Sequence, residues 1–322
     1  MKKIVFILSF FLAFSCNGPA DNPEDPEDPE VPVVVKLKVN YPDFNSDSAY
    51  SLVAKQVAFG PRVPGTAQHL KCFNFMKDYL LKYSDTVYFQ YGTTKTFDNT
   101  IIPIKNIIAS FNPQSKDRVL LFTHWDTRPF ADQDTKDVKL PILGANDGGS
   151  GTAILMEMAR LFKTQKPGIG VDLIFFDSED WGGGEMEDSY CLGSQYWGKN
   201  QHVPNYTARF GILLDMVGAP GATFGHEQFS EQFRSVIDKV WNAAADKGYS
   251  NYFTNYFHGP ITDDHFYVNK YTGIPVIDII HYDQHTNRFG KYWHTHDDNM
   301  NAIDKQTLKA VGETLMKVVY EE

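Results

Sequence analysis

Several histidine and carboxylate residues of this sequence directly follow apolar runs, and such residues can bind a metal ion or move protons. They are His124, Asp126, Asp177, Glu179, Asp180 and Asp215. Carboxylates held close together repel one another, so a cluster of them needs a compensating partner. Zinc accepts histidine and carboxylate ligands and would supply that charge. The cluster could also work as an acid–base site or form only a charged rim, and the residues alone leave these alternatives open.

The apolar runs before these residues have the length and composition of buried strands. VLLFT at 119–123, DLIFF at 172–176 and GILL at 211–214 are almost continuously apolar, which is typical of strands covered on both faces. We expect helices over 46–59, 66–82, 149–162, 229–245 and 302–320, and further strands over 86–91, 104–111 and 275–280. This alternation predicts an α/β fold with a mostly parallel sheet. Ligands of such folds bind beyond the carboxyl ends of the strands, where the polar cluster falls.

Asp147 is a further candidate, because it stands just before the predicted helix at 149–162. Aspartate at the start of a helix is commonly a cap that accepts hydrogen bonds from the first amide groups. From its position alone, Asp147 could therefore be a helix cap or a ligand.

The N-terminus has the features of a secretory signal. Lys2 and Lys3 precede an apolar run over 4–14, so residues 1–15 are interpreted as a signal peptide. The segment 13–16 resembles a bacterial lipobox, which predicts acylation of Cys16, although ordinary signal cleavage nearby is the alternative. We therefore expect an exported bacterial lipoprotein, anchored to a membrane through Cys16 and facing the periplasm or the cell exterior.

Residues 16–32 are rich in proline and acidic side chains and have almost nothing apolar to bury, so we interpret them as an extended tether. The catalytic domain is then expected over 33–322. The formal net charge of the chain is −10, and no basic patch suggests a nucleic-acid partner. Cys72 and Cys191 could form a disulfide in an oxidising compartment or remain buried free thiols.

Six segments, taken together and in order, resemble the zinc aminopeptidase clan and, within it, the glutaminyl cyclases. They are THWDT at 123–127, GANDGGSG at 144–151, FFDSEDWG at 175–182, LLDMVGA at 213–219, TDDHF at 262–266 and YWHTHDDN at 292–299. The resemblance implies a three-layer α/β/α fold around a central mixed, mostly parallel sheet. It also implies an acyltransferase that converts the N-terminal glutamine of peptides and proteins to pyroglutamate and releases ammonia.

The same resemblance implies roles for particular residues. One zinc ion per chain would be held by Asp147, Asp180 and His294, and Glu179 would be the general acid and base. Asp180 departs from the family pattern, in which glutamate is common at this position, but it remains a carboxylate.

A zinc aminopeptidase is the alternative function, because such enzymes use two metal ions and His124 and Asp215 occupy the additional ligand positions. Asp263 favours the cyclase, in which the corresponding acid hydrogen-bonds the residue at the position of Asp215. Both acids are therefore expected in the catalytic site. The resemblance also predicts a substrate pocket with aromatic walls. Its candidate residues are Trp293 and Phe289, with Trp181, Tyr190 or Trp197 as a further wall.

Overall fold

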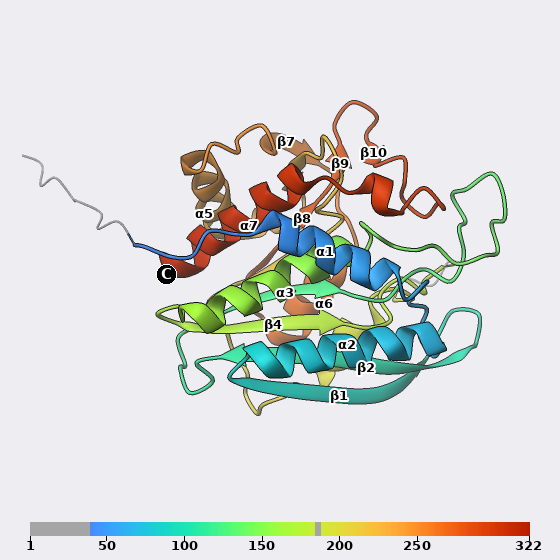
Figure 1. Ribbon diagram of the computed structural model, residues 1–322, viewed down its shortest axis with the longest axis horizontal. Helices are drawn as coiled ribbons and strands as arrows, with labels where there is room; N and C mark the ends of the chain where they lie inside the picture. The colour runs from blue at the N-terminus through green and yellow to red at the C-terminus, as the bar shows by residue number, and fades with distance from the viewer. Residues whose placement is uncertain (1–38, 184–187) are drawn as a thin grey trace, which may run out of the picture. The chain divides into compact units, whose positions relative to one another are not determined.

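A mixed six-stranded sheet forms the centre of the computed structural model, which describes residues 39–183 and 188–322. The strands are β1 (Thr86–Lys95), β2 (Ile101–Phe111), β3 (Arg118–His124), β4 (Gly170–Phe176), β5 (Gly211–Asp215) and β8 (Val276–Ile280), in the spatial order β1-β2-β4-β3-β5-β8. β4, β3, β5 and β8 pair in parallel, whereas β2 is antiparallel to both β1 and β4 (Figure 1). The predicted mixed, mostly parallel sheet is therefore confirmed.

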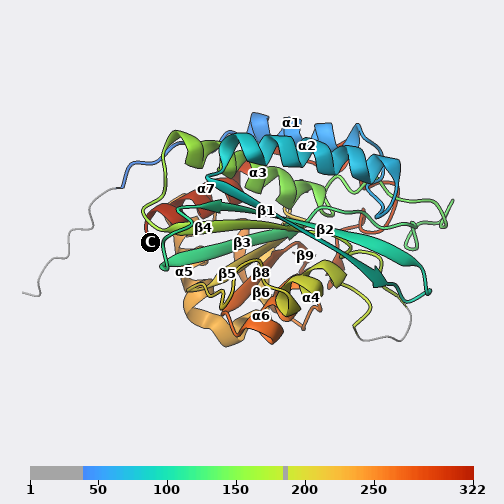
Figure 2. The same ribbon diagram turned by 90° about the horizontal axis from the view of Figure 1, so that it is seen from below.

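Helices cover both faces of the sheet, which gives the three layers expected (Figure 2). One face packs against α1 (Ser46–Val57), α2 (Ala67–Tyr83), α3 (Gly149–Thr164), α5 (Arg234–Asp246) and α7 (Lys305–Tyr320). The other packs against α4 (Leu192–Lys199) and α6 (Asp264–Thr272). Successive strand residues alternate between the two cores: Leu121 belongs to the first, and Leu120 and Phe122 to the second. This alternation explains why the strands read as continuous apolar runs.

Side-chain caps place the starts of several helices where the sequence indicates them. Asn45 accepts a hydrogen bond from the Ser48 amide before α1, and Thr66 accepts one from His69 before α2. Asp304 does the same for α7, which therefore begins at Lys305 and not at the predicted residue 302. Such caps satisfy amide groups that the helix itself leaves unpaired.

The structure also contains short elements that were not predicted. They are α4, α6, the parallel pair β6 (Phe224–Glu227) and β7 (Phe253–His258), the hairpin β9 (Tyr282–Asp283) and β10 (Arg288–Phe289), and the 3-10 turn η2 (Met300–Ala302). The helix predicted over 229–245 is divided into a 3-10 turn, η1 (Ser230–Phe233), and α5. None of the described helices is long and apolar enough to cross a membrane.

The predicted signal peptide over 1–15, the acylation site at Cys16, the tether over 16–32 and the start of the catalytic domain at residue 33 lie outside the described residues. Cys72 and Cys191 are buried free thiols and do not form the disulfide that was the other alternative.

Candidate metal and acid–base site

Three neighbouring strands end at the same edge of the sheet, and each ends at or just before a residue of the polar cluster. β3 ends at His124, β5 ends at Asp215, and β4 is followed directly by Asp177. β3 pairs in parallel with both of the others, so their carboxyl ends lie side by side. The sheet brings His124 and Asp215 together as predicted, whereas the Asp177 side chain turns to His69 Nε2, at 2.8 Å.

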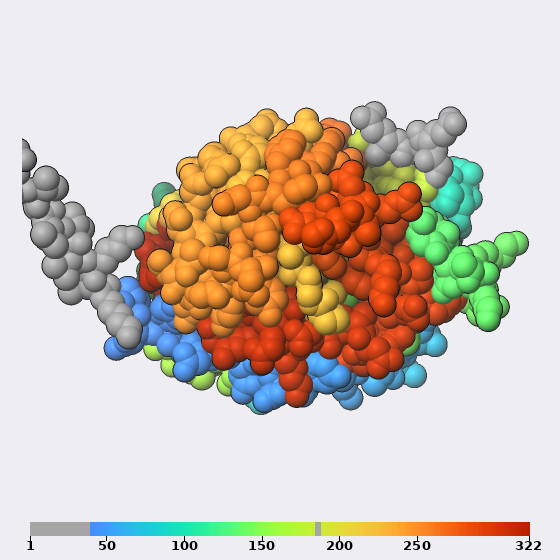
Figure 3. Space-filling view, turned by 90° about the horizontal axis from the view of Figure 1, so that it is seen from above, coloured from blue at the N-terminus to red at the C-terminus, as the bar shows by residue number. Residues whose placement is uncertain are grey.

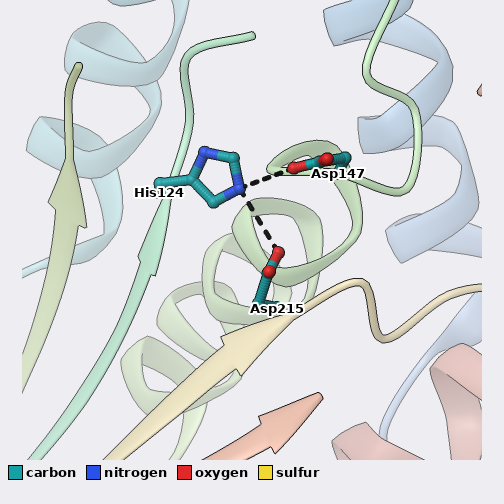
Figure 4. Close-up of side chains that lie close together, drawn as sticks. All are labelled: His124, Asp147 and Asp215. Carbon is teal, nitrogen blue, oxygen red and sulfur yellow. Dashed lines mark hydrogen bonds and ion pairs between the residues drawn. The ribbon is translucent and has the colours of Figure 1, made fainter. Parts of the chain in front are cut away.

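Two groups of potential metal ligands meet at this edge, and they share Asp147. In the first group, His124 Nε2 lies 3.0 Å from Asp147 Oδ1 and 3.3 Å from Asp215 Oδ1 (Figure 4). In the second group, His294 Nε2 lies 3.2 Å from Asp180 Oδ1 and 3.8 Å from Asp147 Oδ2. The ligand atoms within each group all lie within 4.8 Å of one another. The two oxygens of Asp147 thus face different histidines.

The second group fits a divalent cation. Asp147, Asp180 and His294 are all buried, and Asp180 Oδ2 has no hydrogen-bond partner among the described residues. Burial raises the pKa of Asp180, and the neighbouring Asp147 raises it further. An unpaired buried carboxylate oxygen is costly, and a cation would remove that cost. Histidine with two carboxylates is a donor set that zinc accepts, and three protein ligands leave a position open for a substrate.

Asp147 does not cap the helix that follows it. The residue before α3 is Gly148, and no side chain in the described part of the chain caps that helix. Instead, Asp298 accepts hydrogen bonds from the Asn146 amide at 2.7 Å and from the Asp147 amide at 3.0 Å. These bonds fix the backbone and leave the Asp147 carboxylate directed at the two histidines.

Arg62 holds the same loop from the side of the core. Its fully buried guanidinium group donates to the carbonyl oxygens of Trp125, Leu143 and Gly144 at 2.7–2.8 Å. Neither Arg62 nor Asp298 was identified from the sequence. Asp298 lies within the YWHTHDDN segment, which was a usable signal, whereas nothing near Arg62 indicates its distant partners.

Two aspartates outside the ligand group orient His294 and the acid pair, Glu179 and Asp180. His294 Nδ1 lies 3.4 Å from Asp132 Oδ1, the kind of contact that fixes the orientation of a ligating imidazole. Asp126 accepts hydrogen bonds from the Glu179 amide at 3.0 Å and from the Asp180 amide at 3.3 Å. The acid pair is therefore held through its backbone, which leaves both carboxyl groups free for other contacts.

Glu179 lies beside the ligands but belongs to a different group, with Cys191 and Asp263. Burial raises the pKa of Glu179 well above the ordinary value, and the Asp263 and Asp180 carboxylates raise it further. Its Oε1 accepts a hydrogen bond from the Cys191 thiol at 3.2 Å, and its Oε2 lies 4.0 Å from His124 Nδ1. A carboxyl group with a raised pKa at the edge of a metal site is suited to exchange protons.

Asp215 and Asp263 are both buried next to the cavity, where burial raises the pKa of Asp215 to about 6 and that of Asp263 to about 7. The hydrogen bond predicted between them is not present among the described residues. Asp215 faces His124 instead, and Asp263 accepts a hydrogen bond from the Asp264 amide at 2.5 Å. Asp263 is therefore the N-terminal cap of α6.

A cavity of about 380 Å³ opens onto these groups, and Tyr190, Phe289 and Trp293 line it as predicted. The ring centroids of Trp293 and Phe289 are 4.8 Å apart, and Trp293 stacks on His294 at 3.8 Å. The β7-to-α7 part of the chain, orange to red in Figure 3, supplies most of the wall and covers much of the face drawn there. Wall residues that the sequence did not indicate include Met216, Ile261 and Tyr282.

Trp181 and Trp197 do not line this cavity. The Trp181 indole N–H points to Asp98 Oδ2, at 3.4 Å, in the turn between β1 and β2. Trp197 belongs to α4, and its side chain is buried in the core between that helix and the sheet. Of the three residues considered for the further aromatic wall, the structure therefore brings only Tyr190 to the cavity.

Comparison with known proteins identifies the family. A sequence profile described as peptidase family M28 matches residues 106–319. The chain belongs to peptidase family M28. The M28 chain is 50% identical to a solved Zn-dependent exopeptidase from Parabacteroides distasonis, with a TM-score of 0.86 over 88% of this chain and 100% of that one. It is 48% identical to the solved glutaminyl cyclase of Bacteroides thetaiotaomicron, with the same TM-score and the same coverage.

Among curated relatives, the M28 chain is 27% identical to bovine glutaminyl-peptide cyclotransferase over 250 residues. That match covers 67% of this chain and 65% of the bovine protein. The α/β/α fold is thus shared with solved structures that carry two different names, an exopeptidase and a cyclase.

Proposed function

We propose that this M28 protein is a glutaminyl-peptide cyclotransferase, which converts an N-terminal glutamine to pyroglutamate with release of ammonia. The main observation in support of this proposal is the cavity of about 380 Å³, which has aromatic walls and opens onto the ligand group and Glu179. Aromatic side chains favour burial of the methylene groups of a glutamine side chain while a few polar groups orient its amide. The 48% identity to a solved glutaminyl cyclase supports the same conclusion.

We assign zinc to the group of Asp147, Asp180 and His294. When bound there, zinc supplies Lewis-acid polarisation of the substrate's side-chain amide carbonyl. The protein's own part is to hold these three ligands in place, through Asp298 behind Asp147, Asp126 behind Asp180 and Asp132 behind His294.

Glu179 moves the proton in the proposed reaction. The substrate's α-amine nitrogen forms a bond to the side-chain amide carbon and loses a proton, which Glu179 accepts. Glu179 returns that proton to the leaving nitrogen as the carbon–nitrogen bond of the amide breaks, so ammonia departs and the ring remains. A single carboxyl group within reach of both nitrogens can serve both steps. The raised pKa of Glu179 suits it to give the proton back.

A zinc aminopeptidase is the second candidate, and one observation favours it. His124, Asp147 and Asp215 form a second group of ligands next to the first, so the chain has donors for two metal ions that share Asp147. The name of the exopeptidase at 50% identity points the same way. The peptidase would hydrolyse the bond after the first residue of a peptide and would not release ammonia.

Two dipeptides distinguish the candidates. Purified protein is incubated with Gln-Ala and, separately, with Leu-Ala, and both ammonia and free amino acids are measured. The proposal predicts ammonia from Gln-Ala and no amino acids from either peptide. Free leucine and alanine without ammonia would establish the aminopeptidase instead.

A further inference from the structure

Cys191 is a buried residue whose thiol donates a hydrogen bond to Glu179, and the proposed reaction gives it no role. Its side chain is fully buried, and its Sγ lies 3.2 Å from Glu179 Oε1. Cys72, the other described cysteine, is equally buried but lies in α2, and neither cysteine lines the cavity itself. The two thiols thus differ in what they touch and not in how accessible they are.

The backbone around Cys191 is built to hold it against the acid pair. The Cys191 amide donates to the Glu179 carbonyl at 2.9 Å, and the Leu192 amide donates to the Ser178 carbonyl at 3.0 Å. Cys191 adopts a left-handed backbone conformation with φ 57°, which is uncommon for a residue with a side chain. A side chain at Gly193 would place its Cβ 2.0 Å from the Asp177 carbonyl oxygen, so α4 must approach the end of β4 this closely.

Further contacts fix the start of α4 from the opposite side. The Ser194 hydroxyl group lies 3.1 Å from the Cys191 carbonyl oxygen and 2.5 Å from Asp264 Oδ1, where α6 begins. The backbone of Cys191 is therefore held by the start of α6 on one side and, on the other, by the loop after β4 that carries Glu179. Side chains held in this way are oriented before a substrate arrives.

The two oxygens of Glu179 consequently have different surroundings. Oε1 accepts the hydrogen bond of the thiol, whereas Oε2 lies 4.0 Å from Nδ1 of His124, whose Nε2 lies 3.0 Å from the proposed ligand Asp147. We propose that Cys191 is a positioning residue for Glu179, whose S–H group holds Oε1 so that Oε2 is the oxygen that accepts and returns the proton. This inference rests on the proposed proton-shuttle role of Glu179.

A thiol suits this task because it is a weak donor. It can select the orientation of the carboxyl group through Oε1 while Oε2 remains able to exchange a proton. Removing the thiol, as the substitution by alanine does, should leave Glu179 in several orientations, with an expected loss in kcat of roughly tenfold, the upper end for one such hydrogen bond.

The test compares Cys191→Ala, Cys191→Ser and the matched control Cys72→Ala, each with its zinc content and melting temperature. We expect Cys191→Ala to lower kcat roughly tenfold with little change in KM, Cys191→Ser to recover most of the rate, and Cys72→Ala to keep it. The Ala substitution should have no further effect in a Glu179→Gln background, because a positioning residue acts only through the group that it positions. Full activity of Cys191→Ala, or an equal loss in both backgrounds, would overturn the inference.

Crystal structures of the two Cys191 variants provide a readout that does not depend on activity. The serine hydroxyl group should keep its contact with Oε1, and the alanine variant should show Glu179 displaced or in more than one orientation. An unchanged Glu179 in the alanine variant would contradict the inference. If the wild-type protein releases amino acids and no ammonia, the proposed function fails, and the same variants are then compared with Leu-Ala as substrate.

Discussion

Replacement of Glu179 by glutamine tests whether this residue transfers protons without binding the metal ion. The substitution keeps the size of the side chain and an acceptor for the Cys191 thiol but removes the group that exchanges protons. General acid–base catalysis contributes ~10²–10⁴-fold, so kcat should fall by that factor, equivalent to about 3–5 kcal/mol in the barrier. Zinc content should be unchanged, because Glu179 lies outside the group of Asp147, Asp180 and His294.

The melting temperature gives this variant a second signature. Burial, together with the Asp263 and Asp180 carboxylates, outweighs the attraction of His124 and raises the pKa of Glu179, so the folded protein disfavours a charge here, and a neutral glutamine should leave stability unchanged or increased. The control is Glu157→Gln, because Glu157 is fully buried in α3, pairs with Arg160 at 2.6 Å and does not line the cavity. That variant should lose stability and keep kcat. Loss of zinc from Glu179→Gln, or turnover near the wild-type rate, would refute the assignment of the proton shuttle.

Three further predictions concern the pocket, acid stability and the anchor. Trp293→Ala should lower kcat/KM roughly 10–100-fold while changing the melting temperature little; a comparable collapse of folding would make Trp293 a core residue. Burial acts to raise the pKa of Glu227, but hydrogen bonds from His265 and nearby amides outweigh it and lower the pKa to about 2, below the ordinary 4.5. Glu227 therefore contributes about 3 kcal/mol above pH ~4.5 that is lost as the pH falls towards 2. Unfolding measured against pH should show a smaller loss in Glu227→Gln, and parallel curves would count against this. Cys16→Ser should move the protein from the membrane fraction to the soluble one, since a lipid adds ~0.8 kcal/mol per buried CH₂; unchanged fractionation would exclude lipid as the anchor.

The parts of the fold that could be predicted are those in which local sequence and tertiary environment agree. β3, β4 and β5 are apolar throughout because both of their faces are covered, and each ends where polar residues begin. The elements that were missed are short or partly exposed. β7, for example, has only its first and last residues, Phe253 and His258, buried, so its pattern is weak.

Contacts between residues far apart in the chain explain what could not be predicted in the site. Trp181 follows the acid pair in sequence, yet its indole turns to Asp98 in a hairpin more than eighty residues earlier. The hydrogen bond from Cys191 to Glu179 depends on how α4 docks at the end of β4. Arg62 is a buried cation whose partners are backbone carbonyl oxygens. Every residue has such an oxygen, so the sequence does not indicate which ones Arg62 contacts.

We propose that this protein needs one zinc ion, bound by Asp147, Asp180 and His294, to cyclise an N-terminal glutamine. The most direct measurement removes all metal with a chelator, returns zinc in fractions of an equivalent per chain, and follows ammonia from Gln-Ala and amino acids from Leu-Ala at each step. We expect ammonia release to rise in proportion to zinc, to reach its full rate at one equivalent, and to be accompanied by no amino acids. Activity that appears only as a second equivalent binds, or cleavage of Leu-Ala that grows with it, would contradict the account and point to a two-metal peptidase that uses His124 and Asp215.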